Sequence, residues 1–343
     1  MKPFATARRA LLVAATLSLH ACGMPGAHSA GRGPWPTLDG QAPLVIAHRG
    51  ASGDLPEETR EADARAVELG ADVIEMDLVS TRDGVLIARH DVNLAISTDV
   101  AMHPEFAARK KTLDVDGAPQ TGWFCNDFTL AEIRTLGAIA PDPARPQQFN
   151  GLFKVLTFQE VIDFARAQSK ATGRSVAIYP ESKNPDYFRA HGLPIEGPIV
   201  ATLAAAGWNH RTAPVFVQSF SADSLQRMRR LGLRTRVVQL VGGAERHAML
   251  TPAGLARIAA YADGIGPSKR DVTATVVADA HRAGLVVHPF TFSRPPRGPA
   301  ADGQNDPVNE YLAYYRLGVD GVFTDFSGVA LAARAAFLKQ IAP

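Results

Sequence analysis

The stretch Val73-Ile74-Glu75-Met76-Asp77 is the most informative part of this chain, because it sets two carboxylates inside an apolar β-strand candidate. Successive side chains of a strand point to opposite faces. The residues expected on one face are Val73, Glu75, Asp77 and Val79. Two neighbouring anions on a buried strand repel each other and lose hydration, so they require a cation or a shared proton. A divalent metal ion that prefers oxygen ligands meets this requirement, and the stretch therefore predicts an active site.

Apolar strand-like runs alternate with helical stretches from Pro43 onward, which is the pattern of a parallel α/β fold. The strand candidates are residues 44–48, 73–78, 85–90, 175–181, 215–220, 235–240, 263–266, 285–290 and 321–325. The helix candidates are residues 59–69, 157–169, 196–206, 222–231, 252–261, 273–283 and 306–317. A closed (β/α)8 TIM-type barrel has eight strands, so at least one candidate is expected to be miscounted or outside the barrel.

The barrel is expected to be distorted in two places. The second and third strand candidates are joined only by residues 81–84, which is too short for a parallel crossover and predicts a β-hairpin. Residues 92–150 lack barrel periodicity and are expected to be an insertion after the third candidate. Trp123 and Phe124 in this insertion either cover the mouth of the barrel or pack the insertion onto it. Residues 43–343 are thus predicted to form one barrel domain.

The composition is that of an ordinary globular protein, with 343 residues, 46% apolar and 20% charged. Three of the 36 Lys and Arg residues fall within the first 21 residues, which contain no acid. The rest of the chain therefore has 33 basic against 34 acidic residues, a net charge of −1. The sequence has no basic patch with interleaved aromatic residues, so we expect no nucleic-acid partner.

The start of the chain predicts export. Residues 1–21 combine a basic beginning with an apolar run too short to span a bilayer, as in a signal peptide. The motif Leu19-His20-Ala21-Cys22 resembles the bacterial lipobox, in which the cysteine carries lipid. The alternative is ordinary signal-peptidase cleavage, with Ala30 as an end point. Residues 22–42, rich in Gly, Pro, Ala and Ser, are expected to be the lipidated cysteine and a flexible tether, which predicts a periplasmic, membrane-anchored lipoprotein.

Polar residues stand at the end of, or just past, several strand candidates. They are His48, Glu75, His90, Glu181 and Asp325. TIM-barrel active sites gather at the carboxyl ends of the strands, so these side chains are expected at one site. Two histidines beside a carboxylate metal site form an acid–base pair, since one donates a proton while the other accepts one. The alternative, in which both histidines bind the metal, is less favoured, because three carboxylates suit a hard cation whereas imidazole favours zinc.

The segment Tyr179-Pro180-Glu181-Ser182-Lys183 closes a further strand candidate. Glu181 and Lys183 lie on one face by the period of two. Glu181 would be the third oxygen ligand, and Lys183 and Arg49 would neutralise an anionic substrate. The alternative is an exposed Glu/Lys pair, which contributes little.

Taken together, these motifs closely resemble those of the glycerophosphodiester phosphodiesterase family. They are residues 45–51, 55–59, 75–77, 90–91, 178–183, 218–220 and 321–325. They span most of residues 43–330. Residues 127–130 and Tyr179 are most similar to the periplasmic, calcium-dependent branch of that family.

The resemblance implies a role for each site residue. His48 and His90 would be the acid–base pair. Arg49 and Lys183 would bind the phosphate. The ligands of a divalent cation, Ca²⁺ with Mg²⁺ as the alternative, would be Glu75, Asp77 and Glu181.

One position departs from the pattern of the family. Glu57 lies in the Pro-Glu-Asn-Thr motif and would orient the first histidine or the arginine. Glu58 stands where that motif usually has asparagine, which adds a negative charge near the expected phosphate site.

The activity implied is metal-dependent hydrolysis of glycerophosphodiesters, such as glycerophosphocholine or glycerophosphoethanolamine, to glycerol 3-phosphate and an alcohol. Two alternatives remain open. One is a related phospholipase that acts on lysophospholipids or phosphoinositides. The other is a catalytically silent binding lipoprotein. The sequence does not indicate an oligomeric state.

Overall fold

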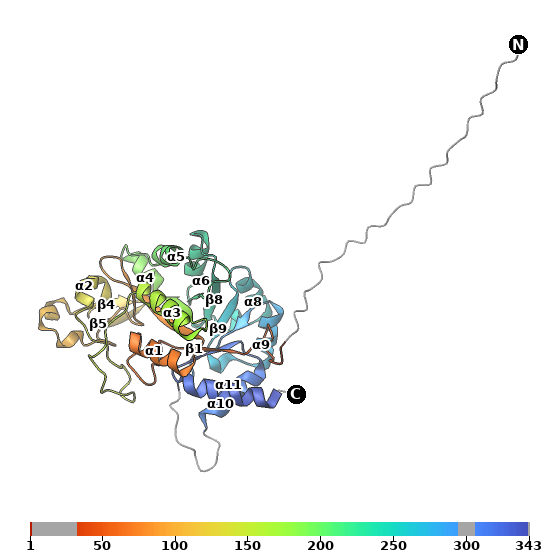
Figure 1. The fold of residues 1–343 in the computed structure, drawn as a ribbon. Coiled ribbons are helices and arrows are strands. Elements are labelled where there is room, and N and C mark those ends of the chain that lie inside the picture. The colour runs from red at the N-terminus through yellow and green to blue at the C-terminus, as the bar shows by residue number, and fades with distance from the viewer. Residues whose placement is uncertain (2–32, 294–305, 342–343) are drawn as a thin grey trace. The chain divides into compact units, whose positions relative to one another are not determined.

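The structure is a computed structural model that describes Met1 and residues 33–293 and 306–341 (Figure 1). The folded unit begins at Gly33. Apart from Met1, the predicted signal peptide (residues 1–21) and Cys22 lie outside the described residues.

Eight parallel strands form a sheet in the order β10-β9-β8-β7-β6-β2-β1-β11. They are β1 (Leu44–Ala47), β2 (Val73–Ser80), β6 (Ala177–Ser182), β7 (Phe216–Ser219), β8 (Arg236–Val241), β9 (Gly264–Pro267), β10 (Val286–Val287) and β11 (Gly321–Thr324). The two ends of this sheet meet, because Asp320 N donates to Val287 O and Phe323 N donates to Pro289 O. The predicted TIM-type barrel is therefore confirmed.

The third strand candidate, residues 85–90, lies outside the barrel. It is β3 (Leu86–Ala88), which pairs antiparallel with the carboxyl end of β2. The four-residue turn forces this arrangement, since a parallel return needs a crossover of a dozen residues or more. The predicted β-hairpin is confirmed.

Helices surround the strands (Figure 1). The seven predicted ones are α1 (Arg60–Leu69), α3 (Phe158–Thr172), α5 (Glu196–Ala205), α6 (Ala222–Arg230), α8 (Pro252–Ala259), α9 (Ala274–Arg282) and α10 (Pro307–Leu317). Helical elements that the sequence analysis did not anticipate are α4 (Pro185–Ala190), α7 (Arg246–Met249), η4 (Lys269–Asp271) and α11 (Ser327–Ile341). Of these, α11 is the longest, and it packs along α10 and against β1.

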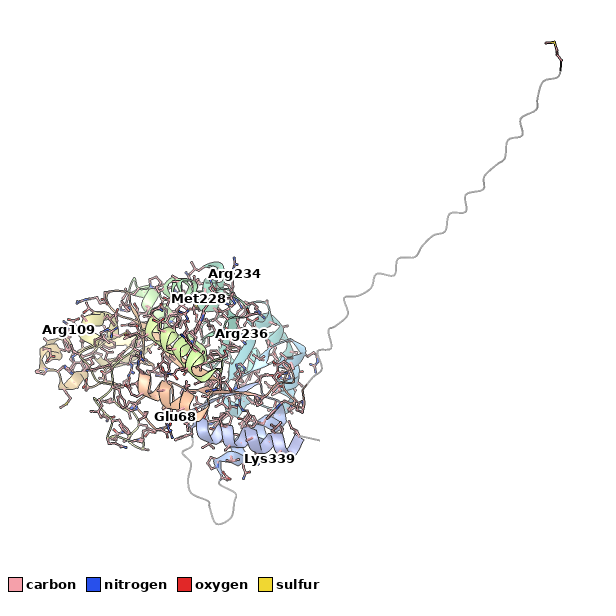
Figure 2. The ribbon with its side chains drawn as sticks, in the orientation of Figure 1. Glu68, Arg109, Met228, Arg234, Arg236 and Lys339 are labelled. Atoms are coloured by element: carbon pink, nitrogen blue, oxygen red, sulfur yellow. The ribbon has the colours of Figure 1, made fainter. Side chains whose placement is uncertain are left out.

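No barrel strand occurs between β3 and α3, where the insertion was predicted. Its elements are η1 (Val100–Met102), η2 (Pro104–Arg109), β4 (Lys111–Val115), β5 (Ala118–Gly122), η3 (Cys125–Asp127) and α2 (Leu130–Ile133). In Figure 1 they gather at one side of the barrel. Arg109, labelled in Figure 2, pairs with Glu132 and lies over the ring of Phe128, so this segment has a packed interior of its own.

Trp123 and Phe124 pack the insertion and do not cover the mouth of the barrel. Both are buried, and the Trp123 indole donates a hydrogen bond to Phe106 O at 2.7 Å. Cys125 is also buried, and burial raises the pKa of its thiol. None of these helices, within the described residues, combines the length and apolar character that a bilayer crossing requires.

The predicted boundary at residue 43 is wrong. Trp35 is buried and its ring lies 5.5 Å from that of Phe337 on α11. Leu38 N donates to the Asp320 carboxylate at 2.7 Å. The aromatic ring and the backbone bond attach residues 33–42 to the barrel, so this part of the expected tether belongs to the folded domain.

The interior of the barrel is a small cluster below the carboxyl ends of the strands. Its buried members are Ile46, Val73, Tyr179, Phe216, Val238 and Phe323. Val73 therefore faces inward, as predicted. Val79 packs instead in the larger outer core, because β2 has left the β6 ladder by that point and pairs with β3.

His288 is buried against this interior cluster and faces Tyr179, whose hydroxyl lies 3.1 Å from His288 Nδ1. Burial lowers the pKa of His288 to about 4, although Asp320 partly opposes the shift. An unfolded histidine has a pKa of about 6.5, so the unfolded chain binds the proton first as the pH falls. The stabilising effect of the neutral ring is complete above about pH 6.5 and is lost as the pH falls towards 4.

We predict that His288→Leu flattens the acid limb of the stability profile. Between pH 7.5 and 4.5 the wild type should lose about 2–3 kcal/mol more unfolding free energy than the variant, because leucine takes up no proton on unfolding. Urea denaturation at the two pH values measures the difference. His247→Leu, at an exposed position of α7, is the control, and equal pH slopes in all three proteins would contradict the prediction.

Candidate active site

The loop after β1 carries His48 and Arg49. His48 N donates to Thr324 O of β11 and so extends the barrel ladder by one residue. Arg49 and Gly50 then have φ values of +58° and +79°, which turn the chain sharply. A Cβ at Gly50 would lie 2.8 Å from the carbonyl carbon of Ala62, so glycine is required where this loop meets α1. The turn leaves His48 and Arg49 at the mouth of the barrel.

Three carboxylates converge beside this loop. Glu75 and Asp77 come from β2, and Glu181 lies directly opposite Asp77 on β6. One oxygen of each lies within 4.8 Å of the others, and all three side chains are buried. The period of two thus places these side chains where the sequence predicted them, on the inward face of both strands.

The predicted phosphate-binding cations lie against these acids. Lys183 Nζ is 3.3 Å from Glu181 Oε1 and 3.7 Å from Asp77 Oδ1. Arg49 Nε is 3.2 Å from Asp77 Oδ2, and Arg49 Nη1 donates to both oxygens of Glu57 at 3.0 and 3.1 Å. Of the two partners expected for Glu57, the structure therefore places the arginine against it.

Burial and charge set the protonation of the cluster. Burial raises the pKa of Glu75 well above its usual value, and the neighbouring Asp77 adds to this. Burial also raises the pKa of Glu181, to about 7, against the opposing effect of Lys183. Burial would do the same to Asp77, but Lys183, His90 and Arg49 outweigh it and lower its pKa. In the absence of a metal ion, the cluster therefore retains protons at neutral pH.

Each predicted catalytic histidine has its own carboxylate. His48 Nδ1 lies 2.7 Å from Asp325 Oδ1, and His90 Nδ1 lies 3.1 Å from Asp91 Oδ2. A carboxylate accepts, so the hydrogen bond from His48 to Asp325 places the His48 proton on Nδ1 and leaves Nε2 for the reaction. Burial would raise the pKa of Asp325, but the hydrogen bond and the charge of His48 lower it.

A cavity of about 220 Å³ brings the site together. Its polar side is lined by His48, Arg49, Glu75, Asp77, His90, Glu181, Lys183 and Gln218. The remaining lining is largely apolar and consists of Phe220, Leu240, Phe290, Thr291 and Phe323. Seven of the eight predicted site residues line this one cavity, and Glu57 lies behind Arg49.

Three residues at the site had no role in the sequence analysis. Gln218 Nε2 donates to Glu75 Oε1 at 3.0 Å, while Glu75 Oε2 accepts from Arg49 N at 2.8 Å, so the Glu75 carboxylate has one orientation. Asp325 orients His48 through a hydrogen bond, and Asp91 lies beside His90 as an ion-pair partner. All three residues lie at or just after the end of a strand. Because TIM-barrel active sites lie at the carboxyl ends of the strands, the sequence indicated where these residues would be, but not which side chains they would contact.

Glu58 does not lie at the phosphate-binding cavity, contrary to expectation. Its side chain is buried behind β2, where Oε1 accepts from Asp77 N at 2.8 Å. Burial, followed by the charges of Asp77 and Glu75, raises the pKa of Glu58 well above its usual value. A protonated Glu58 is neutral, like the asparagine usual at this position of the family motif.

The donor set fits a hard divalent cation. The three converging groups are all carboxylates, which Ca²⁺ and Mg²⁺ prefer, and imidazole is not among them. Gln218 Oε1, buried at the same cavity, has no hydrogen-bond partner among the described residues. A cation held by Glu75, Asp77 and Glu181 would favour the ionised forms of Glu75 and Glu181, whose pKa values burial raises.

The fold and the site together define a class of protein. A TIM barrel with three converging carboxylates, two histidines, an arginine and a lysine at the carboxyl ends of its strands has the groups that a metal-dependent phosphodiester hydrolase requires.

Comparisons with known proteins agree with this class. Residues 48–329 match the model of the glycerophosphoryl diester phosphodiesterase family. Glycerophosphodiester phosphodiesterase GDPD6 of Arabidopsis thaliana is 41% identical over 322 residues, covering 85% of this chain and 86% of that protein. A glycerophosphodiester phosphodiesterase of Haemophilus influenzae is 31% identical, covering 87% and 90% of the two chains.

A solved structure has the same fold. It is an Oleispira antarctica phosphodiesterase in complex with the product sn-glycerol-3-phosphate, with a TM-score of 0.60 and 20% identity over 85% of this chain and 96% of that one. The chain belongs to the glycerophosphoryl diester phosphodiesterase family, and it is an enzyme.

We predict that binding of a divalent cation releases protons. The bound ion requires ionised Glu75 and Glu181, whose pKa values are raised, so the apparent affinity should increase as the pH rises from 6 to 8. Calorimetric titration with Ca²⁺ in two buffers of different ionisation enthalpy measures the proton count. Asp77→Asn should abolish the binding heat, whereas Glu68→Gln on α1 (Figure 2) should leave it unchanged. A pH-independent affinity would refute the assignment of the ligands.

Proposed function

We propose that this enzyme hydrolyses glycerophosphodiesters, such as glycerophosphocholine or glycerophosphoethanolamine, to glycerol 3-phosphate and an alcohol. The observation that carries the proposal is the convergence of three carboxylates, two histidines and two cations on one cavity. The names of its relatives support the substrate class, and the sn-glycerol-3-phosphate bound to the Oleispira enzyme supports the product.

The residues of the cavity divide the chemistry between them. A divalent cation, when bound, polarises a phosphoryl oxygen and stabilises the charge that develops on it. Arg49 offers the phosphate a planar fork of donors, and Lys183 offers a point charge. One histidine removes a proton from the nucleophile, either water or the glycerol 2-hydroxyl, and the other protonates the leaving alcohol. Attack by water gives glycerol 3-phosphate directly, whereas attack by the 2-hydroxyl gives a cyclic phosphate that a water molecule then opens.

The apolar side of the cavity faces the carbon skeleton of the substrate. Phe220, Phe290 and Phe323 form much of it. They exclude water from the reacting phosphate, which strengthens the electrostatic contribution of Arg49 and Lys183. The small volume of the cavity favours a deacylated diester over a substrate with an acyl chain.

Ca²⁺ is the ion we assign to the site, with Mg²⁺ as the alternative. The resemblance of residues 127–130 and Tyr179 to the calcium-dependent branch supports this choice. A further point is that Asp77 and Glu181 already contact protein groups on several sides, and Ca²⁺ accepts such irregular coordination more readily than Mg²⁺ does.

We predict that His48→Ala and His90→Ala each lower kcat for glycerophosphocholine by about 10²–10⁴-fold, the usual contribution of a general acid or base. Release of glycerol 3-phosphate measures the rate, which EDTA should abolish and Ca²⁺ restore more fully than Mg²⁺. His247→Ala on α7 is the control and should keep the wild-type rate.

Parallel assays with a lysophospholipid and a phosphoinositide separate the related phospholipase activities. Faster turnover of either one by the wild type would contradict the proposed substrate class. Metal binding without turnover of any diester would favour the silent binding protein.

We further propose that the enzyme is exported to the periplasm and anchored by lipid on Cys22. The basic residues Lys2, Arg8 and Arg9, the apolar run and the motif Leu19-His20-Ala21-Cys22 support this. The anchor would hold the catalytic domain close to a membrane that supplies diesters from degraded lipids.

We predict that the full-length chain, expressed in a bacterium, incorporates labelled palmitate and that Cys22→Ser abolishes the label. Cys125→Ser is the matched control, because that thiol is buried inside the folded domain and should take no lipid. Unlabelled wild-type protein with a mature end at residue 31 would indicate ordinary cleavage after Ala30.

A further inference from the structure

We propose that Arg145, which comes from the insertion and not from the barrel, is a positioning residue that acts on His48 through Asp325. The inference rests on the proposed function, because it assumes that His48 is one of the two acid–base groups. Arg145 does not line the cavity that contains the carboxylates.

The contact geometry forms a chain of three side chains. Arg145 Nη2 lies 2.5 Å from Asp325 Oδ2, and Asp325 Oδ1 lies 2.7 Å from His48 Nδ1. Arginine and histidine thus take one oxygen each. With Oδ2 fixed by the guanidinium, the carboxylate cannot turn about its terminal bond without breaking a charge-assisted hydrogen bond.

The surroundings show that this arginine is held in place. The side chains of Arg145 and Asp325 are 16% and 7% exposed, and the guanidinium lies 4.9 Å from the ring centre of Phe326. Arg145 lines a second cavity, of about 200 Å³, which His48, Arg49 and Asp325 also line. Ser52 Oγ lies 3.2 Å from Asp325 Oδ1 and 2.7 Å from His48 O.

The chemical consequence is a defined tautomer. An ionised Asp325 facing Nδ1 requires the proton on that nitrogen, so Nε2 is the atom that exchanges a proton with substrate. A cation on the far oxygen stabilises the ionised form of Asp325 and fixes the direction from which it faces the ring. Charged and titratable residues that line the carboxylate cavity with His48 are Arg49, Glu75, Asp77, His90, Glu181 and Lys183. Among the described residues, the ion pairs of Arg145 are with Asp325 and, at 3.7 Å, with Asp142 of the insertion.

The test compares Arg145→Gln with Arg145→Lys in the full enzyme loaded with Ca²⁺. For glycerophosphocholine, Arg145→Gln should lower kcat about 10–100-fold, the range for partners behind a reactive group, with KM within about twofold of wild type. Arg145→Lys should recover part of kcat. Added guanidinium, below the concentration that unfolds the protein, should partly rescue Arg145→Ala.

Arg134→Gln is the matched control. Arg134 also belongs to the insertion and pairs with barrel helix α3 through Glu160 at 2.8 Å, far along the chain from His48. If Arg145 merely docks the insertion, both glutamine variants should lower the melting temperature alike and leave kcat alike, which would overturn the inference.

A readout independent of turnover separates the inference from the proposed function. Nitrogen-15 NMR of the ring of His48, assigned with His48→Ala, should show the Nδ1–H tautomer in the wild type and a mixture in Arg145→Gln. An unchanged tautomer together with an unchanged kcat would overturn the inference. A wild type that hydrolyses no diester would overturn the proposed function, and the NMR result would still decide the role of Arg145.

Discussion

Buried negative charge is the constraint on which the site depends. Five carboxyl groups, those of Glu57, Glu58, Glu75, Asp77 and Glu181, are buried where β2 and β6 end. Fewer cations lie among them, the buried Arg89 and the partly exposed Arg49 and Lys183, so a divalent cation would offset excess negative charge. Without the ion, protons on groups such as Glu58 and Glu75 reduce the repulsion, which is why the pKa values of these two acids are raised. The same excess that would destabilise the fold therefore favours metal binding.

Arg89 connects this charge balance to the backbone. It is fully buried, and its guanidinium donates to the carbonyl oxygens of Glu57 and Glu58 at 2.8 and 3.0 Å and to Ser97 O at 3.0 Å. Its charge opposes the rise in the pKa of Glu58, while its hydrogen bonds fix the loop in which Glu58 has a φ of +60°. Arg89, which directly follows β3, thus holds the loop that contains Glu58. Glu58, the acid that departs from the family motif, is buried there and does not line the cavity.

The sequence predicted what depends on local periodicity. The period of two placed Glu75, Asp77, Glu181 and Lys183 on inward faces, and the short turn at residues 81–84 required the hairpin. It could not predict contacts between distant segments. Arg145 and Asp325 are 180 residues apart in the sequence, and Trp35 and Phe337 lie near opposite ends of it. Neither pairing therefore leaves a local sequence pattern. Helix α11 was missed because its alanine-rich sequence, 327–341, has little contrast between its faces.

The insertion contacts residues of the active-site region at two places. Arg145 meets Asp325 behind His48, and Asp116, at the tip of the β4–β5 hairpin, accepts a hydrogen bond from Asn184 at 2.5 Å, next to Lys183. The strands β2 and β6 supply the predicted metal ligands Glu75, Asp77 and Glu181, whose positions the barrel ladder fixes. The insertion supplies Arg145 and Asp116, which contact Asp325 and Asn184 from outside the ladder. Its length and sequence can therefore change without moving the carboxylates, whereas a change in β2 or β6 would disturb the charge balance on which the whole site rests.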